Sequence, residues 1–204
     1  GEAGNFKVEL TKYPRYIDET KCIACGACAE KCPKKVSDRY NMGLAKRKAA
    51  YVEYAQAVPL KYAIDADSCI FLQKGKCGAC QKICPTGAVD FKQKPTIETL
   101  NVGAVILAPG FSPFDPGRFD NYQYLNLPNV VTSMEFERLL SASGPTAGHV
   151  TRQSKDHGEP KKIAWFQCVG SRDQNKCDNS YCSSVCCMYA IKEAVIAKEH
   201  AGDD

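Results

Sequence analysis

The stretch that decides the fold of this 204-residue chain is "CIACGACAEKCP", which runs from Cys22 to Pro33. Its four cysteines follow the spacing C-x2-C-x2-C-x3-C-P, in which a short turn aims three thiolates at one compact iron–sulfur cluster. Small residues are needed between such ligands, and Gly26 and Ala27 provide that room. The spacing therefore predicts a [4Fe–4S] cluster bound within a tight turn.

A second stretch, "CGACQKICPTGAVDF" from Cys77 to Phe91, repeats the pattern. It matches from its second ligand onward, with seven residues instead of two between Cys69 and Cys77. In paired motifs of this kind the fourth cysteine of each binds the cluster of the other. This crosswise rule assigns one cluster to Cys22, Cys25, Cys28 and Cys84, and the other to Cys32, Cys69, Cys77 and Cys80.

Zinc and disulfide bonds are the alternative uses of these cysteines. Zinc sites commonly combine two separated C-x2-C pairs, which differ from a triple run that ends in proline. The chain has 13 cysteines, and an odd number argues against a complete disulfide set. Iron–sulfur clusters are therefore favoured, with a zinc- or disulfide-stapled scaffold without redox activity as the alternative class of function.

Positive charge gathers on the cysteine-rich part of the chain. Residues 21–94 carry 14 Lys or Arg against 6 Asp or Glu, whereas the net charge of the whole chain is only +4. Lysines near anionic clusters lower the cost of burying that charge and attract an acidic redox partner. The basic run 46–48 lacks an aromatic stacking pattern, so nucleic-acid binding is not expected.

Without a leader peptide or an apolar run of 18 residues, the sequence predicts a cytoplasmic protein with no direct membrane span.

The remaining segments predict a mixture of strands and helices. Strands are expected within residues 6–18, 57–65, 102–108 and 161–167, and helices within 37–56, 134–143 and 183–201. Thr132 and Glu135 fit a capping box at the start of the second of these helices. The last strand and helix predict half of a βαβ unit. Because the chain begins and ends abruptly, it is expected to be an internal segment of a longer protein.

Residues 18–95 resemble a bacterial-type two-cluster ferredoxin, and the whole chain is similar to the heterodisulfide reductase A-subunit family. The second resemblance rests on "GNFKVELTKYPRYID" (4–18), "MGLAKRKAAYVEYAQAVPLKYAID" (42–65), "VGAVILAPGFSPFDP" (102–116), "CVGSRD" (168–173) and "YCSSVCCMYAIKEA" (181–194). It implies an α+β fold, in which the ferredoxin module is inserted in part of a thioredoxin-reductase-like α/β flavoprotein domain. On that plan residues 1–17 are a strand of the flavoprotein domain, and residues 18–95 are the ferredoxin domain. Residues 96–160 return into the FAD domain and include a linker. Residues 161–204 start a nucleotide-binding-like βα unit that carries a third cluster.

The resemblance also implies further cofactor sites. The third [4Fe–4S] cluster would be held by Cys168, Cys182, Cys186 and Cys187, and "VILAPG" resembles a flavoprotein turn that would bring Ala108, Pro109 and Gly110 near FAD. Cys182 and Cys186, four residues apart, would share one face of a helix. Buried apolar cysteines, a Cys186–Cys187 disulfide or zinc are the alternatives, and Cys177 has no place in the set. Since no G-x-G-x-x-G is present, the main FAD phosphate site is expected outside this sequence, and no nicotinamide binding is expected at "CVGSRD".

In function, the resemblance implies electron transfer through [4Fe–4S] clusters as part of an anaerobic oxidoreductase subunit, in some complexes with flavin-based electron bifurcation. This segment would carry no catalytic residue and would only transfer electrons. Its expected partners are other heterodisulfide reductase subunits and, as redox partner, a hydrogenase, a formate dehydrogenase or a ferredoxin. A quinone-interacting oxidoreductase subunit of a sulfate reducer is the alternative among redox proteins.

Overall fold

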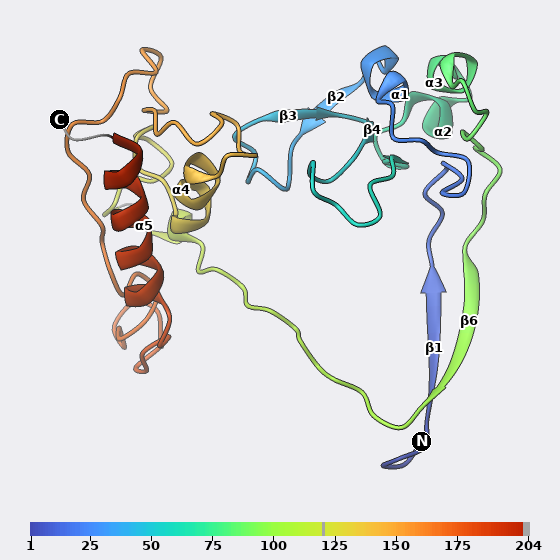
Figure 1. Cartoon of the computed structure of the whole chain (residues 1–204). Coiled ribbons are helices and arrows are strands. Elements are labelled where there is room, and N and C mark those ends of the chain that lie inside the picture. Colours follow the sequence, from blue (N-terminus) through green and yellow to red (C-terminus); the bar gives the residue numbers. More distant parts are fainter. Residues whose placement is uncertain (120, 202–204) are drawn as a thin grey trace. The chain divides into compact units, whose positions relative to one another are not determined.

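The computed structural model describes residues 1–119 and 121–201, and the chain divides into two compact units (Figure 1). We call them the N-terminal unit (Gly1–Tyr40 and Lys46–Gly110) and the C-terminal unit (Asn41–Ala45 and Phe111–Asp204). Each unit has a hydrophobic core of its own. The predicted cluster-binding cysteines are therefore shared between two separately packed parts of the chain.

An antiparallel pair of strands forms one end of the N-terminal unit. β1 (Phe6–Lys12) pairs with β6 (Thr96–Val102) over seven residues, and Figure 1 shows the two strands side by side. Val8 and Leu10 alternate with polar residues, as expected of an extended strand. The strand predicted within residues 6–18 is thus confirmed.

The cysteine-bearing part of the N-terminal unit consists of very short elements. The helices are α1 (Ala27–Lys31), α2 (Ile70–Lys74) and α3 (Ala79–Ile83), and the strand pairs are β2 (Lys35–Ser37) with β3 (Lys46–Lys48) and β4 (Ala50–Tyr51) with β5 (Ala63–Ile64). Its core is one small cluster of buried residues. Ile17 is 3% exposed and bridges Val89, while Ile64 is 4% exposed and pairs with Ala50.

The helix predicted within residues 37–56 is wrong, because short strands and turns occupy this stretch. Arg47 supplies the physical reason. Its guanidinium lies over the Tyr51 ring, 3.8 Å from the centroid, and its Nη2 atom lies 3.0 Å from Oδ2 of Asp65. Strand pairing and these tertiary contacts outweigh the helix propensity of the stretch. The strand predicted at 57–65 is present only as the two residues of β5.

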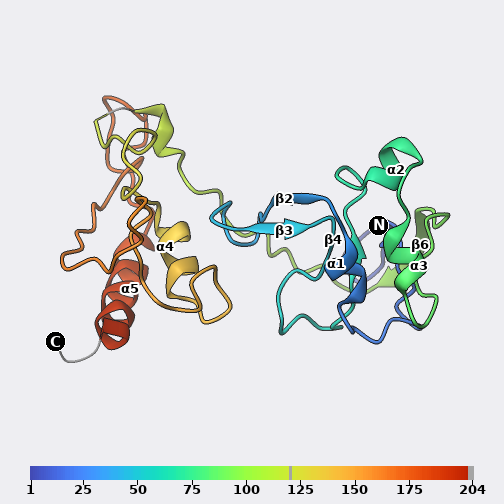
Figure 2. The same cartoon turned by 90° about the horizontal axis from the view of Figure 1, so that it is seen from above.

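The C-terminal unit contains two longer helices. α4 (Ser133–Leu140) follows a single 3-10 turn, η1 (Pro116–Arg118), and α5 (Cys186–Ala201) ends the described chain. Figure 2 shows α4 beside α5, and Phe136 and Leu139 of α4 share a buried cluster with Ala197 of α5. The edge of the Trp165 ring meets Phe136 at a centroid distance of 5.8 Å. Within residues 1–119 and 121–201, none of the helices has both the length and the apolar character needed to cross a membrane.

The predicted capping box at the start of α4 is confirmed. The hydroxyl of Thr132 accepts a hydrogen bond of 3.2 Å from the backbone N–H of Glu135, and a carboxylate oxygen of Glu135 accepts one of 2.6 Å from the N–H of Thr132. Two backbone donors at the helix start thereby find partners. The helix ends at Leu140, three residues earlier than the predicted segment.

The strands predicted at residues 102–108 and 161–167 are wrong. β6 ends at Val102, and Ile106 and Leu107 beyond it are 92% and 84% exposed, so the segment is neither a strand nor buried. Residues 161–167 form no strand either, and Phe166 is 71% exposed. An apolar run becomes a strand only when another strand satisfies its backbone groups. In the described chain α5 therefore follows an irregular segment, and the predicted half βαβ unit lacks its strand.

Candidate metal centres

Each cysteine motif opens with the same backbone turn. The N–H of Cys22 donates to the carbonyl of Asp18, and the N–H of Cys69 donates to the carbonyl of Asp65, both at 2.9 Å. The Asp18 carboxylate also accepts from the N–H of Thr20 at 2.9 Å, which fixes the turn from its other side. Cys22 and Cys69, each 8% exposed, are thereby held at the inner side of their motifs.

A glycine in the left-handed region begins the helix of each motif. Gly26 has φ of 83° before α1, and Gly78 has φ of 76° before α3. A Cβ atom at Gly26 would lie 3.2 Å from the hydroxyl of Tyr62, and one at Gly78 would lie 3.6 Å from the Phe71 ring. Glycine is therefore needed at Gly26 for both its backbone angle and its close contact.

Four cysteines line a first cavity, which is partly open to solvent: Cys22, Cys25, Cys28 and Cys84. The first three come from the motif around α1, and Cys84 comes from the end of α3. Ile17, Tyr62 and Val89 are among the apolar side chains that complete the walls. These are the four cysteines that the crosswise rule assigns to one cluster.

A second cavity, also partly open to solvent, is lined by the other four: Cys32, Cys69, Cys77 and Cys80. Cys32 reaches it from the end of α1, whereas the other three belong to the second motif. Phe71 and Phe91 also line this cavity, and their rings stack at 4.1 Å. Apolar walls around thiolate ligands exclude water. Solvent exposure is one of the factors that set the reduction potential of a cluster.

The buried cysteines need a nearby cation in order to lose their protons and act as thiolate ligands. Burial raises the pKa of Cys28 to about 12 and that of Cys80 to about 11, and neighbouring cysteines add to the rise. As thiolates they require a cation, and iron in a cluster supplies it. Among residues 1–119 and 121–201, no three Cys, His, Asp or Glu side chains meet closely enough to hold a single metal ion. Four cysteine donors in each cavity are the ligand set of a [4Fe–4S] cluster.

Cys84 differs from Cys28 and Cys80 in the direction in which its pKa is shifted. Burial acts to raise its pKa, but hydrogen bonds from Thr86 and from the backbone hold the pKa of Cys84 below its usual value. One of these is the N–H of Ala88, which lies 3.3 Å from Sγ of Cys84. Hydrogen bonds to the sulfur ligands are among the factors that set the reduction potential of a cluster.

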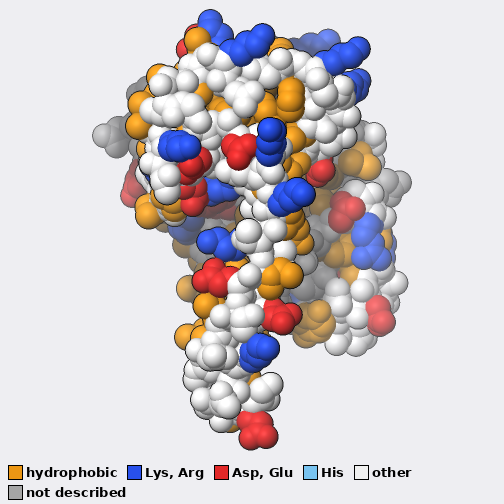
Figure 3. Space-filling model, turned by 90° about the vertical axis from the view of Figure 1, so that its right-hand side faces the viewer, with side chains coloured by type: hydrophobic (Ala, Val, Ile, Leu, Met, Phe, Trp, Pro, Cys, Tyr) orange, Lys and Arg blue, Asp and Glu red, His pale blue; other side chains and the backbone are white. Residues whose placement is uncertain are grey.

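Basic side chains surround these motifs. Lys31, Lys74 and Lys82 lie in the last turns of α1, α2 and α3. On the face of the N-terminal unit drawn in Figure 3, Lys and Arg side chains gather over the upper part. Two further lysines act at shorter range, since Lys61 Nζ donates to the carbonyl of Cys22 and Lys48 Nζ to that of Cys32, both at 2.5 Å. The excess of Lys and Arg in this part of the chain can be read from the sequence, but these two hydrogen bonds cannot be predicted from it.

Four cysteines of the C-terminal unit also come together. Hydrogen bonds from the Ser183 hydroxyl, the Cys168 backbone and the Cys187 side chain lower the pKa of Cys186, although burial opposes them. The charge of Cys186 is the main influence that raises the pKa of Cys187, and Cys168 and Cys182 add to it. The set Cys168, Cys182, Cys186 and Cys187 is therefore close enough for electrostatic interaction. Cys177 instead points its sulfur at Asp173, 3.5 Å from Oδ2.

The helix argument for this set is wrong, because α5 begins at Cys186 and Cys182 lies in the preceding loop. The two cysteines do not share a helix face. Cys168 lies in a turn with φ of 60°, and its carbonyl accepts from the N–H of Ser171 at 3.1 Å. A turn, a loop and a helix start thus bring the four residues together.

Ala108, Pro109 and Gly110 lie at the end of the N-terminal unit. All three are exposed, and Gly110 has φ of 70°. The left-handed glycine fits the turn that the sequence predicts there. The preceding apolar residues are exposed rather than packed, and this irregular segment contributes no residue to the lining of the two cysteine-lined cavities.

Residues 21–88 match a family model described as a 4Fe-4S dicluster domain. This range includes all eight cysteines of the two cavities and excludes the set near α5. The match therefore supports two clusters in the N-terminal unit.

The whole chain is similar to larger iron–sulfur proteins of methanogens. It is 46% identical over 200 residues to the iron-sulfur A-subunit of the CoB–CoM heterodisulfide reductase of Methanocaldococcus jannaschii, covering 98% of this chain and 29% of that protein. It is 49% identical over 199 residues to the second iron-sulfur A-subunit of the CoB–CoM heterodisulfide reductase of Methanopyrus kandleri, with 98% and 29% covered. The A-subunit of the ferredoxin:CoB-CoM heterodisulfide reductase of Methanosarcina acetivorans is 40% identical over 226 residues, with 98% and 28% covered. The chain thus spans less than a third of the length of these relatives.

Proposed function

Because the chain belongs to the heterodisulfide reductase A-subunit family, over the part of those subunits that it spans, we propose that it conducts electrons through [4Fe–4S] clusters inside such an oxidoreductase subunit. Such clusters accept and pass on one electron at a time. The chain's own contribution is to bind the clusters through thiolates, to exclude water and to surround them with positive charge. No residue of this segment is assigned a catalytic step.

The observation that carries the proposal is the grouping of the cysteines into two sets of four. One set is Cys22, Cys25, Cys28 and Cys84, and the other is Cys32, Cys69, Cys77 and Cys80. Each cavity has three cysteines from one motif and one from the other motif. A two-cluster ferredoxin requires this arrangement. Two clusters in one small core also give electrons a short path from one site to the next.

Metal and sulfide analysis tests this proposal. Protein prepared without oxygen should contain about eight iron atoms and as much acid-labile sulfide for the two sites of the N-terminal unit. Reduction should produce the EPR signals of two [4Fe–4S]⁺ clusters. Zinc in place of iron, with no acid-labile sulfide, would show that the cysteines form a scaffold instead.

We propose a third [4Fe–4S] cluster at Cys168, Cys182, Cys186 and Cys187. The support is that Cys186, Cys168 and Cys182 all raise the pKa of Cys187, that the backbone of Cys168 hydrogen-bonds to Cys186, and that Cys177 lies apart, against Asp173. With this cluster the protein holds about twelve iron atoms. Replacing Cys187 by serine should lower the iron content by about four while the EPR signals of the other two clusters remain.

Cys177→Ser is the matched control, because it removes a cysteine of the same unit that lies against Asp173. It should keep the full iron content. Equal loss of iron in both variants would remove the third site, as would a wild-type content of about eight.

The flavin and the catalytic reaction belong to the whole subunit. We propose that the turn at Ala108 to Gly110 approaches FAD in a thioredoxin-reductase-like domain formed with sequence beyond this segment, and that the main phosphate site lies there too. The left-handed Gly110 and the exposed apolar residues before it support a segment that another part of the protein covers. Whether electrons bifurcate at that flavin is tested by flavin analysis and kinetics of the complete subunit.

The names of the relatives support a proposal for the partners, and the cysteines support one for the location. The names describe reductases of the CoB–CoM heterodisulfide, and the name of the Methanosarcina acetivorans protein also includes ferredoxin. We propose that this protein likewise works with other heterodisulfide reductase subunits and with a ferredoxin, a hydrogenase or a formate dehydrogenase. Its thirteen free cysteines suit a reducing compartment such as the cytoplasm. Copurification of these subunits with the protein tests the assembly.

A further inference from the structure

Each cysteine-lined cavity has one lysine attached to the backbone of one of its cysteines. Lys61 Nζ donates to the carbonyl of Cys22, a residue of the first cavity, at 2.5 Å. Lys48 Nζ donates to the carbonyl of Cys32, a residue of the second cavity, at 2.5 Å. The partners lie 39 and 16 residues apart along the chain, so both contacts are products of the fold.

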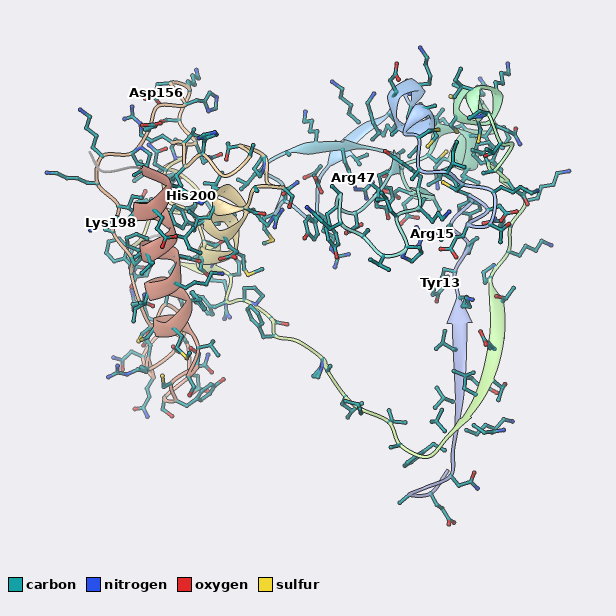
Figure 4. All side chains as sticks on the ribbon, in the orientation of Figure 1. Tyr13, Arg15, Arg47, Asp156, Lys198 and His200 are labelled. Carbon is teal, nitrogen blue, oxygen red and sulfur yellow. The ribbon has the colours of Figure 1, made fainter. Side chains whose placement is uncertain are left out.

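An arginine fixes the backbone of each lysine. Nη2 of Arg15 donates to the carbonyl of Lys61 at 2.8 Å, and Nη1 of Arg47 donates to the carbonyl of Lys48 at 3.1 Å. Figure 4 labels both arginines. We call Arg15–Lys61 the first cationic arm and Arg47–Lys48 the second cationic arm. The lysine of each arm thus donates to the backbone of a cysteine of one cavity, and the arginine of the arm holds the carbonyl of that lysine.

The arms are anchored well enough to keep their charges in place. Arg47 is tied to Asp65 at 3.0 Å and is only 20% exposed, and Nε of Arg15 lies 3.2 Å from the carboxylate of Glu19. Each lysine is half-buried and directly precedes a residue of the cavity wall, Tyr62 in the first case and Ala49 in the second. A charge fixed in a half-buried position is screened less by water and salt than a charge on a mobile surface side chain.

A fixed positive charge acts differently on the two redox states of a cluster. Reduction adds one electron, supplied in solution by a chemical reductant, and therefore one negative charge at the site; no bond is made or broken. A nearby ammonium group stabilises the reduced state more than the oxidised state. It therefore raises the reduction potential of the cluster next to it.

We propose that Lys61 sets the reduction potential of the cluster in the first cavity and that Lys48 independently sets that of the cluster in the second cavity. This inference rests on the proposed function, because it needs both clusters. Both cavities have the same ligand set of four cysteines, which by itself does not make their reduction potentials different. A separate lysine beside each cavity explains how the two potentials can be set independently. Neither lysine ligates a cluster, so both are positioning residues.

The test is a redox titration of the anaerobically purified protein, followed by EPR, with Lys61→Met and Lys48→Met. Cys84→Ser and Cys32→Ser identify which signal belongs to which cavity. Lys61→Met should lower the midpoint potential of the first cluster by at least the equivalent of a tenfold change in its reduction equilibrium, about 59 mV for one electron. The second cluster should keep its potential, and Lys48→Met should give the reverse result.

Two sets of variants separate charge from structure. Lys61→Arg and Lys48→Arg keep the positive charge and should keep the wild-type potentials, which a loss of packing alone does not predict. Lys46→Met removes an exposed lysine from the same strand as Lys48 and should move neither potential. Should a methionine variant fail to assemble its cluster, Lys61→Gln and Lys48→Gln provide neutral side chains that retain a donor.

The outcomes are distinguishable. Wild-type protein without iron–sulfur signals overturns the proposed function and this inference with it. Two wild-type signals with unchanged potentials in all neutral variants, or equal shifts of both clusters in each variant, overturn the inference alone.

Discussion

Cys32 and Cys84 end the two equivalent motifs, and each lines the cavity formed mainly by the other motif. Cys32 follows α1 but joins Cys69, Cys77 and Cys80, whereas Cys84 follows α3 but joins the cysteines around α1. Neither half can therefore complete its own site. The two cavities are thus linked through the fold, because each is lined by cysteines of both motifs.

This crossing predicts which cluster each substitution removes. Cys84→Ser should disturb the cluster with Cys22, Cys25 and Cys28, although Cys84 lies in the second motif. Cys32→Ser should disturb the other cluster. The reason is that a weaker hydroxyl ligand replaces one of four thiolates at one site only. EPR of the reduced protein and iron analysis measure the effect, and loss of the cluster of its own motif in either variant contradicts the crosswise arrangement.

Glu193 gives the C-terminal unit a predicted dependence on pH. The side chain is 1% exposed, and it accepts a hydrogen bond of 3.1 Å from the ring N–H of Trp165. Burial raises the pKa of Glu193 from 4.5 to about 7; the negative charge of Glu137 adds to the rise, and Trp165 and Lys192 oppose it. The folded state therefore binds the proton more tightly than the unfolded state. The contribution of this group to stability is greatest below pH 4.5 and falls as the pH rises through 7.

Glu193→Gln should remove this dependence. At pH 8 the variant should have a free energy of unfolding about 1–3 kcal/mol higher than wild type, because a neutral amide avoids the cost of a buried charge. Trp165 is the single tryptophan of the chain, so its fluorescence during urea unfolding reports on this unit. Glu199→Gln, at an exposed position of the same helix, is the control and should leave the pH profile unchanged. A wild-type profile that is flat between pH 5 and 8 is the contrary result.

Thr132 and Glu135 make a reciprocal cap whose loss should destabilise α4. Thr132→Ala leaves the N–H of Glu135 without its acceptor and should lower the free energy of unfolding of the C-terminal unit by about 1 kcal/mol. Thr132→Ser keeps the hydroxyl and should cost much less. Urea unfolding at constant pH measures both, and equal losses in the two variants would mean that the threonine methyl group, not the cap, matters.

The sequence predicts a grouping of cysteines that matches the linings of the two cavities, whereas it also predicts strands that the described residues do not form; cluster binding by these cysteines stays a prediction. Cysteine spacing alone separates the eight cysteines into the two groups that line the cavities, because short turns fix the positions of neighbouring ligands. The strands expected at 102–108 and 161–167 depend on partners that an apolar pattern cannot specify. The contacts of Lys48 and Lys61 were equally hidden, since each joins residues far apart along the chain. The third cysteine set came from a family resemblance rather than from its spacing.

Gly26 offers a test of how tightly the first cavity is built. Gly26→Ala forces an alanine to φ of 83° and brings its Cβ within 3.2 Å of the Tyr62 hydroxyl, and Tyr62 itself lines the cavity. The backbone strain costs about 1–2 kcal/mol, and the contact displaces a cavity wall. We expect a lower yield of the first cluster and a lower free energy of unfolding for the N-terminal unit.

Two further variants divide these effects. Gly75→Ala imposes a similar backbone angle, φ of 66°, where a Cβ meets nothing within 4 Å, so it should show the strain without loss of the first cluster. Adding Tyr62→Phe to Gly26→Ala removes the hydroxyl that the new Cβ approaches and should restore part of the cluster occupancy. Iron content and the EPR signal of the first cluster measure the recovery. If the double variant lacks as much of the cluster as Gly26→Ala does, the backbone angle and not the contact with Tyr62 is what the first cavity requires.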